Sequence, residues 1–237
     1  LSIEHVIVDG GSIDGSAQIA SEFSTVTVES KSDGGIYPAM IRGAEAASGK
    51  YLIFCNAGDA LFGVEFVGQV IRQLKASDKH WGFGPIIEKT QRDSHAWIAV
   101  NAHSTQKSII YRRSFVPFPS FVIEREFFFQ IGGLSSKYQI AGDFEIICKA
   151  AIQTPPYIFK EPIAIFSAGG ISYKRADLAW REEIEIRKSL LLQPLSISLM
   201  EWIRYSARFF RWKIGKLFDF IQNKVSPSSV SWRDKFV

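Results

Sequence analysis

Three aspartates follow apolar segments that are typical of short β-strands. Asp9 comes directly after HVIV, Asp33 lies shortly after TVTVE, and Asp59 follows YLIFC through the three-residue turn NAG. In an open parallel sheet ligands bind beyond the carboxyl ends of the strands, so these carboxylates are expected at one crevice. Mg²⁺ and Mn²⁺ prefer oxygen ligands and are held by one or two carboxylates plus substrate phosphates. The spacing therefore predicts a site for a metal-bound diphosphate.

Two alternatives apply to this part of the chain. Aspartate and glycine gather in turns simply because both tolerate turn geometry. The loop GGSIDG also has the look of a dinucleotide-binding turn, but Ser12 stands where that turn needs a glycine for close approach to a pyrophosphate. Asp9 and Asp14 would in addition repel an anionic phosphate. We therefore reject the dinucleotide interpretation and expect a carboxylate of this turn to accept hydrogen bonds from a base or ribose.

The elements that position these residues alternate between strands and helices, which predicts βαβ units and a parallel sheet. Residues 81–111 differ, because WGFGPIIE, SHAWIAV and KSIIYR are strand-like with no clear helix between them and predict mixed or antiparallel strands. Ser12 or Asp14 is expected to cap the first helix. The other expected strands are 4–8, 25–29, 51–55 and 163–167. The first expected helix ends near Phe23, and the others span about 37–48, 64–75, 124–131 and 143–152.

Composition excludes several classes of protein. The chain has 237 residues, of which 46% are hydrophobic, so it can form a sizeable core and is not expected to be disordered. Its net charge of +4 is too small to indicate nucleic-acid binding. Cys55 and Cys148 lack metal-type spacing, which favours a reduced setting. No apolar run reaches the roughly 18 residues of a membrane-spanning helix.

The segments EHVIVDGGSIDGS and ESKSDGGIYPAMIRGAEAASGKYLIFCNAGD resemble the nucleotide-binding half of family 2 glycosyltransferases, which have the GT-A fold. The similarity runs from about Ile3 to Asp59 and resumes over about Val122–Ala150. It is greatest to bacterial enzymes that assemble surface polysaccharides. The resemblance implies a GT-A-like α/β fold with a mostly parallel sheet flanked by helices. It makes HVIV the second strand of that fold, so a first strand and helix are expected before Leu1.

The resemblance also implies roles for individual residues. Asp9 would contact the nucleoside, Asp59 would be the metal ligand of a degenerate DxD-type motif, and Asp143 in AGDFE would be the catalytic base. An inverting transfer needs such a base to take the proton of the acceptor hydroxyl. A divalent metal, Mg²⁺ or Mn²⁺, is the implied cofactor. The implied nucleotide-binding residues are Asp9, Gly10, Gly11, Ser12, Asp33 and Arg42.

Some of these residues have a simpler interpretation. Asp143 follows Gly142 and could cap a helix, Arg42 could be a solvated helix residue, and Glu145 is expected on a solvated helix face. Pro38 and Ile41 replace polar residues that the family usually has in GIYDAMNKG. These departures favour an alternative in which the protein is a catalytically inactive binding or scaffold protein with the same fold.

The C-terminal region, 176–237, is expected to be a helical appendage to a catalytic domain formed by 1–175. Within 198–223, aliphatic residues recur at helical spacing beside an aromatic stripe and a line of arginines. An amphipathic helix of this kind suits an anionic membrane surface, which predicts a cytoplasmic protein held peripherally at the inner face of the plasma membrane. The alternative is that the aliphatic stripe packs on the catalytic domain.

The sequence therefore predicts an inverting glycosyltransferase. Its expected partners are a nucleotide-sugar donor, foremost a UDP-sugar, and a glycan or lipid-linked acceptor, with no nucleic acid. A sugar nucleotidyltransferase is a further alternative, although no phosphate loop rich in glycine and bearing Lys or Arg is visible near the N-terminus.

Overall fold

The computed structural model describes residues 2–23, 26–28, 34–89, 95–98, 106–112, 116–167, 170 and 175–191. The chain forms two compact units, Leu1–Leu190 and Leu191–Val237, and the described residues belong almost entirely to the first. Asp33 and the stretch 198–223 lie outside the described residues, as do the predictions made for them. The division of roles between 1–175 and 176–237 stays a prediction.

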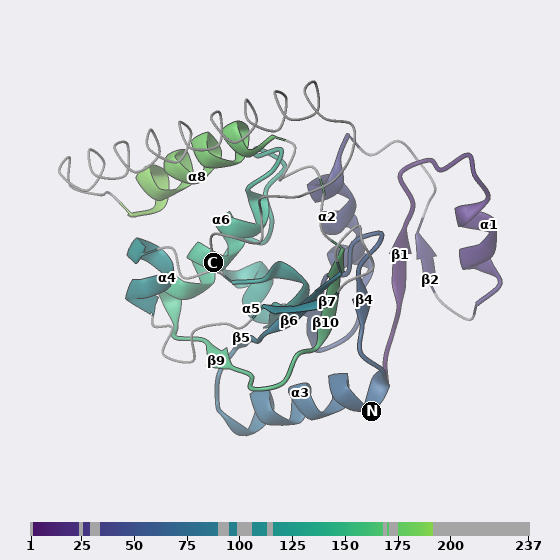
Figure 1. Cartoon of the computed structure of the whole chain (residues 1–237), viewed down its shortest axis with the longest axis horizontal. Coiled ribbons are helices and arrows are strands. Elements are labelled where there is room, and N and C mark those ends of the chain that lie inside the picture. Colours follow the sequence, from purple (N-terminus) through teal and green to yellow (C-terminus); the bar gives the residue numbers. More distant parts are fainter. Residues whose placement is uncertain are drawn as a thin grey trace, which may run out of the picture. The chain divides into compact units, whose positions relative to one another are not determined.

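Strands and helices are interspersed through the first unit (Figure 1). The strands are β1 (Val6–Val8), β2 (Val26–Val28), β3 (Tyr51–Ile53), β4 (Ala60–Leu61), β5 (Trp81–Phe83), β6 (Ile86–Lys89), β7 (His95–Ile98), β8 (Val122–Glu124), β9 (Tyr157–Ile158) and β10 (Ala164–Ser167). The helices are α1 (Ser16–Ser21), α2 (Ile36–Ala46), α3 (Val64–Ala76), α4 (Gln106–Arg112), the 3₁₀ helix η1 (Phe118–Ser120), α5 (Arg125–Gln130), α6 (Gly142–Gln153) and α8 (Ala176–Leu191).

The described strands form three sheets, with orders β1-β2, β4-β10-β6-β7 and β3-β8-β5-β9. The pairs β1-β2, β10-β6 and β5-β9 are parallel, whereas β10-β4, β3-β8, β5-β8 and β6-β7 are antiparallel. The α/β class with flanking helices is confirmed, and the mostly parallel sheet is confirmed only in part. The mixed strands expected within 81–111 are confirmed by β7, which pairs antiparallel with β6.

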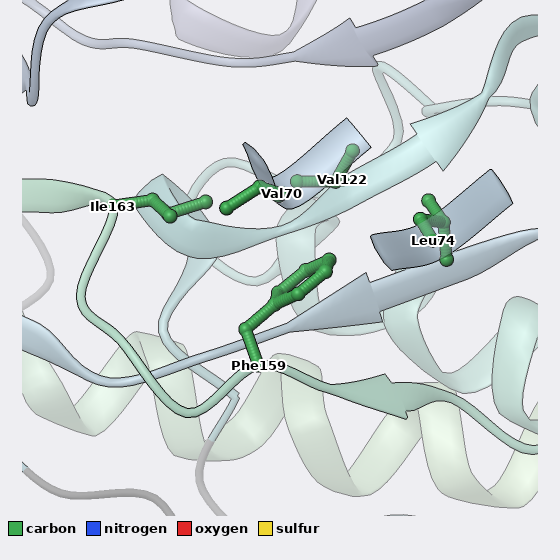
Figure 2. Packing of buried hydrophobic residues seen from close by; sticks show 5 residues of the cluster. All are labelled: Val70, Leu74, Val122, Phe159 and Ile163. Carbon is green, nitrogen blue, oxygen red and sulfur yellow. The ribbon is translucent and has the colours of Figure 1, made fainter. Parts of the chain in front are cut away.

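A buried cluster joins α3 to the four-stranded sheet that contains β8 (Figure 2). Val70 and Leu74 of α3 pack with Val122 of β8 and with Phe159 and Ile163. Valine and leucine at this spacing lie on one helix face, which makes α3 amphipathic. Burying each such side chain contributes about 1.5–3 kcal/mol relative to exposure, so this cluster is a main support of the sheet that carries β3.

Two local expectations are wrong. KSIIYR is not a strand but lies in α4, where the neighbouring residues Ile109 and Ile110 are both buried. A short apolar run of this kind fits a buried helix segment as well as a strand. The N-cap of α1 is Gly15, with no side-chain cap, and Asp14 instead accepts hydrogen bonds from the amide and hydroxyl groups of Ser16.

Candidate active site

The loop after β1 is organised by the carboxylate of Asp9, which is 8% exposed. Its Oδ2 accepts hydrogen bonds from the amides of Gly11 and Ser12, both at 3.0 Å. Gly11 has φ 95°, a left-handed conformation that favours glycine. Gly10, Gly11 and Ser12 are exposed, so the buried carboxylate holds an accessible loop in one shape at the end of β1.

Helix α2 lies against β1 and carries two residues of interest. A Cβ on Gly43 would come within 3.4 Å of the Val8 side chain, next to Asp9, so helix and strand pack closely. Pro38 is tolerated because it lies in the first turn, where amide groups have no acceptor within the helix. Arg42 is half-buried rather than fully solvated, and its contact with a diphosphate stays a prediction.

Asp143 is the second residue of α6 and is half-buried. Ala141 occupies the N-cap position, so Asp143 is not the capping residue, although its Oδ1 accepts the amide of Phe144 at 2.8 Å. Burial raises the pKa of Asp143 to about 6, against the opposing effect of its hydrogen bonds from Phe144 and Tyr37. A carboxylate with this pKa is ionised at neutral pH and basic enough to accept a proton during a reaction.

Tyr37 of α2 is the partner of this carboxylate and is 4% exposed. Its hydroxyl lies between the Ile140 carbonyl and Asp143 Oδ1, which is 3.2 Å away. When Asp143 gains a proton, the same hydroxyl oxygen can accept it in a hydrogen bond while donating to Ile140. The ring fits only because residue 142 is glycine, since a Cβ there would lie 3.0 Å from ring atoms of Tyr37.

Asp59 lies in the turn after β3, and within the described part of the chain only one of its carboxylate oxygens has a hydrogen-bond partner. Oδ1 accepts the amide of Ser167 at 3.0 Å, and the Asp59 amide donates to the Asn56 carbonyl at 2.9 Å. Oδ2 is buried and has no hydrogen-bond partner among the described residues. Burial raises the pKa of Asp59, and hydrogen bonds to its carboxylate from the backbones of Ser167 and Asn56 oppose that shift.

A cation would supply what Asp59 Oδ2 lacks. The described part of the chain contains no group of three or more His, Cys, Asp or Glu side chains that could hold a metal ion. Asp59 fits the other mode of Mg²⁺ and Mn²⁺ binding, in which one carboxylate is combined with water and substrate phosphates. The donor set is therefore compatible with the expected metal.

Three residues that were not predicted from the sequence contact the predicted site residues: Tyr37, Gly142 and Ser167. Of these, only Tyr37 could have been found from the sequence, because the tyrosine of GIYPAM is also present in the family pattern GIYDAM. The expectation for Glu145 is wrong, since it is 8% exposed and pairs with Lys149 at 3.3 Å on the same helix. Within the described ranges, no helix is long and apolar enough to span a membrane.

Comparison with known proteins matches the sequence to one family. The model of glycosyl transferase family 2 matches residues 1–132, which is more than half of the chain. The chain is 28% identical over 181 residues to an uncharacterized glycosyltransferase of Mycobacterium tuberculosis (strain ATCC 25618 / H37Rv), covering 73% of this chain and 66% of the relative. It is 24% identical over 220 residues to a PGL/p-HBAD biosynthesis glycosyltransferase of Mycobacterium bovis (strain BCG / Pasteur 1173P2), covering 86% of this chain and 81% of the relative.

Solved structures agree on the fold. The crystal structure of S. aureus TarS 1-349 in complex with UDP has a TM-score of 0.62 at 14% identity, covering 88% of this chain and 62% of TarS 1-349. The complex with UDP-GlcNAc has a TM-score of 0.58 at 14% identity, covering 77% of this chain and 55% of the other. These likenesses support the GT-A fold expected from the sequence.

Proposed function

Because the chain belongs to glycosyl transferase family 2, we propose that it transfers a sugar from a nucleotide-diphosphate donor to an acceptor hydroxyl with inversion at the anomeric carbon. The observation that carries the proposal is Asp143, a half-buried carboxylate with a pKa of about 6 that is held by Tyr37. This is the kind of group that a single displacement needs as its base.

In the proposed step, Asp143 accepts the proton of the acceptor hydroxyl. The hydroxyl oxygen forms a bond to the anomeric carbon as the bond from that carbon to the diphosphate oxygen breaks, and the nucleoside diphosphate leaves with the electron pair. Tyr37 keeps the carboxylate in place before the transfer and can accept a hydrogen bond from it afterwards. The Tyr37 pKa is raised by burial and by the charge of Asp143, so the phenol stays protonated.

The donor would lie between the loop after β1 and Asp59. We assign the nucleoside to the loop formed by Asp9, Gly10, Gly11 and Ser12, with Asp33 and Arg42 as further nucleotide contacts. Asp59 would hold Mg²⁺ or Mn²⁺ through Oδ2, and the metal when bound would stabilise negative charge on the diphosphate. A UDP-sugar is the favoured donor, and the UDP-GlcNAc and UDP complexes of the structurally similar TarS support that choice.

The acceptor and the location of the protein are further parts of the proposal. The M. bovis relative is named for PGL/p-HBAD biosynthesis, which supports a role in glycan or glycolipid assembly. A lipid-linked acceptor would agree with the arginine- and aromatic-rich stretch 198–223, through which we propose peripheral binding to the inner face of the plasma membrane.

The test measures binding and turnover of UDP-sugars by the whole protein. UDP-GlcNAc and UDP-glucose would be titrated calorimetrically with Mn²⁺, and UDP release would be followed with and without simple glycoside acceptors. In Asp143→Asn we expect binding to persist and UDP release to fall about 10²- to 10⁴-fold, the usual contribution of a general base. Asp78→Asn is the matched control because Asp78 is exposed at the end of α3. Equal turnover of Asp143→Asn and wild type would exclude Asp143 as the base.

A further inference from the structure

One buried carboxylate that has no part in the proposed reaction step accepts hydrogen bonds from the segment that precedes Asp143. Glu182 of α8 is 7% exposed. Its Oε1 accepts the amide of Gln139, and its Oε2 accepts the amides of Ile140 and Ala141, all at 2.9 Å. Three backbone donors therefore converge on one carboxylate, which compensates the cost of burying its charge.

These hydrogen bonds fix the direction of a peptide group that Tyr37 uses. The Ile140 carbonyl and the Ala141 amide belong to one planar trans peptide unit, so they point in opposite directions. Glu182 accepts from the amide end of this unit, and the Tyr37 hydroxyl donates to its carbonyl end. The same hydroxyl contacts Asp143 Oδ1. Glu182 is thus linked to Asp143 through the peptide group between Ile140 and Ala141 and through the Tyr37 hydroxyl.

The same helix also contacts the other side of Asp143. Ile186 of α8 packs with Tyr138 and Ala141, and the Arg187 guanidinium lies over the Phe144 ring, 4.8 Å from its centroid. Phe144 in turn donates its amide to Asp143. Helix α8 therefore holds the residues that flank Asp143 on both sides along the chain.

We propose that Glu182 is a positioning residue for the base of the transfer reaction, acting through the 139–141 segment and Tyr37. This inference rests on the proposed role of Asp143. Glu182 would act without contacting donor or acceptor, through where the Asp143 carboxylate lies and how well it is shielded from water. Loss of Glu182 is expected to lower kcat with little change in the KM of the donor.

The experiment compares Glu182→Gln with Glu185→Gln in the full chain. Both variants change the same residue type on α8, but Glu185 is exposed and pairs with Lys137 at 2.7 Å. A glutamine at 182 has one acceptor oxygen and places an NH₂ group against backbone donors. We expect kcat for UDP release from UDP-GlcNAc with Mn²⁺ to fall about 10- to 100-fold in Glu182→Gln, with KM within about twofold of wild type. Glu185→Gln should match wild type.

The pH profile separates positioning from a general loss of folded protein. Water that enters beside Asp143 lowers the pKa of its carboxyl, because burial is the main cause that raises this pKa. The negative charge of Glu183, which also raises it, stays in place in Glu182→Gln. The acidic limb of kcat should therefore move to lower pH in Glu182→Gln, whereas partial unfolding would scale the profile without moving it. A folded Glu182→Gln with the kcat and acidic limb of wild type overturns the proposal.

Two further variants cover the case in which Glu182→Gln does not fold. Glu182→Asp keeps the charge and should retain part of the activity, and Tyr37→Phe removes the other end of the link while keeping the ring. An unchanged pH profile in Tyr37→Phe would contradict the link from Glu182 to Asp143.

The Asp143 titration can also be followed without substrate, by NMR of ¹³C-labelled aspartate with Asp143→Asn for assignment. If the Asp143 titration differs between Glu182→Gln and wild type but the wild type releases no UDP, the positioning role is supported and the proposed function is refuted. If the wild type is active but the titration is the same in both proteins, the proposed function is supported and the positioning role is refuted.

Discussion

The two aspartates for which we propose roles in the reaction, Asp143 and Asp59, differ in how the fold holds them. Asp143 and Asp59 are both half-buried, and burial raises the pKa of both. Around Asp143, a tyrosine hydroxyl and a backbone amide contact the same oxygen, and helix α8 supports the residues on either side. Around Asp59, one oxygen is fixed by Ser167 and the other is buried without a hydrogen-bond partner among the described residues.

This difference corresponds to two kinds of chemistry. A base must gain and lose a proton without moving, and Tyr37 allows both states of Asp143 with the same contacts. A metal ligand must instead present a lone pair that no protein donor has taken, and Oδ2 of Asp59, which has no hydrogen-bond partner among the described residues, fits that proposed role. The comparison predicts that the two sites respond differently to substitution, with metal dependence confined to Asp59.

The largest effect on donor affinity is expected in Asp59→Ala. Removing the carboxylate removes the proposed protein ligand of the metal, so the Kd for UDP-GlcNAc measured calorimetrically with Mn²⁺ should rise about 10- to 100-fold, in line with the strength of charge-assisted contacts. With EDTA present, wild type and variant should bind equally weakly. Asp143→Asn provides the contrast, because its affinity should keep the full dependence on Mn²⁺. An equal loss of Mn²⁺ dependence in Asp59→Ala and Asp143→Asn would show that metal binding does not depend on Asp59 alone.

A smaller effect is expected from Gly142→Ala, which changes the surroundings of Asp143 and not those of Asp59. The new methyl group would lie 3.0 Å from the Tyr37 ring, so the ring or the start of α6 must shift. We expect kcat to fall about 10-fold and stability by about 1–3 kcal/mol, the usual cost of overpacking. Gly63→Ala is the control, because no atom lies within 4 Å of a Cβ at that position. Unaltered turnover in Gly142→Ala would show that the close fit of Tyr37 is not needed.

Asp143→Asn should also stabilise the protein at neutral pH. The folded pKa of about 6 lies above the ordinary value of 3.8, so the native state binds this proton more tightly than the unfolded chain does. Stability from this group is present below about pH 4 and is lost as the pH rises through about 6. An uncharged asparagine avoids the loss, and we expect about 1–2 kcal/mol of added stability at pH 7, reduced for partial solvent exposure. Urea unfolding at pH 7 and pH 4 measures the difference, which should shrink at the lower pH.

The sequence predicted those parts of the site that depend on local pattern. Apolar runs followed by acidic turns placed Asp9 and Asp59 after β1 and β3, and the family pattern placed Asp143 at the start of a helix. These features follow from strand and helix periodicity, which is visible within a few residues. The antiparallel course of β8 between β3 and β5 was not predicted, because a three-residue strand carries no mark of its direction.

The contacts that support Asp143 could not be predicted in the same way. Glu182 is separated by about forty residues from the amides that it accepts, and a carboxylate that binds backbone leaves no complementary residue type to search for. Glu145 was expected on a solvated face because charged helix residues are mostly exposed, and its burial depends on how α6 packs.

The smallest effect is expected from Glu124→Gln. Glu124 ends β8 and pairs with His80 at 2.7 Å and with Lys50 at 3.2 Å, and these partners lower its pKa, His80 foremost. A lowered pKa means that this stability is present above the ordinary value of 4.5 and is lost as the pH falls through the folded value. Both partners are more than half exposed, so the loss at pH 7 should be under about 1 kcal/mol. Thermal unfolding would show a small decrease that vanishes in acid, while kcat and the Mn²⁺ dependence of binding stay at wild-type values. A change in either would mean that the two aspartate sites are coupled through the β3-β8-β5 sheet rather than held independently.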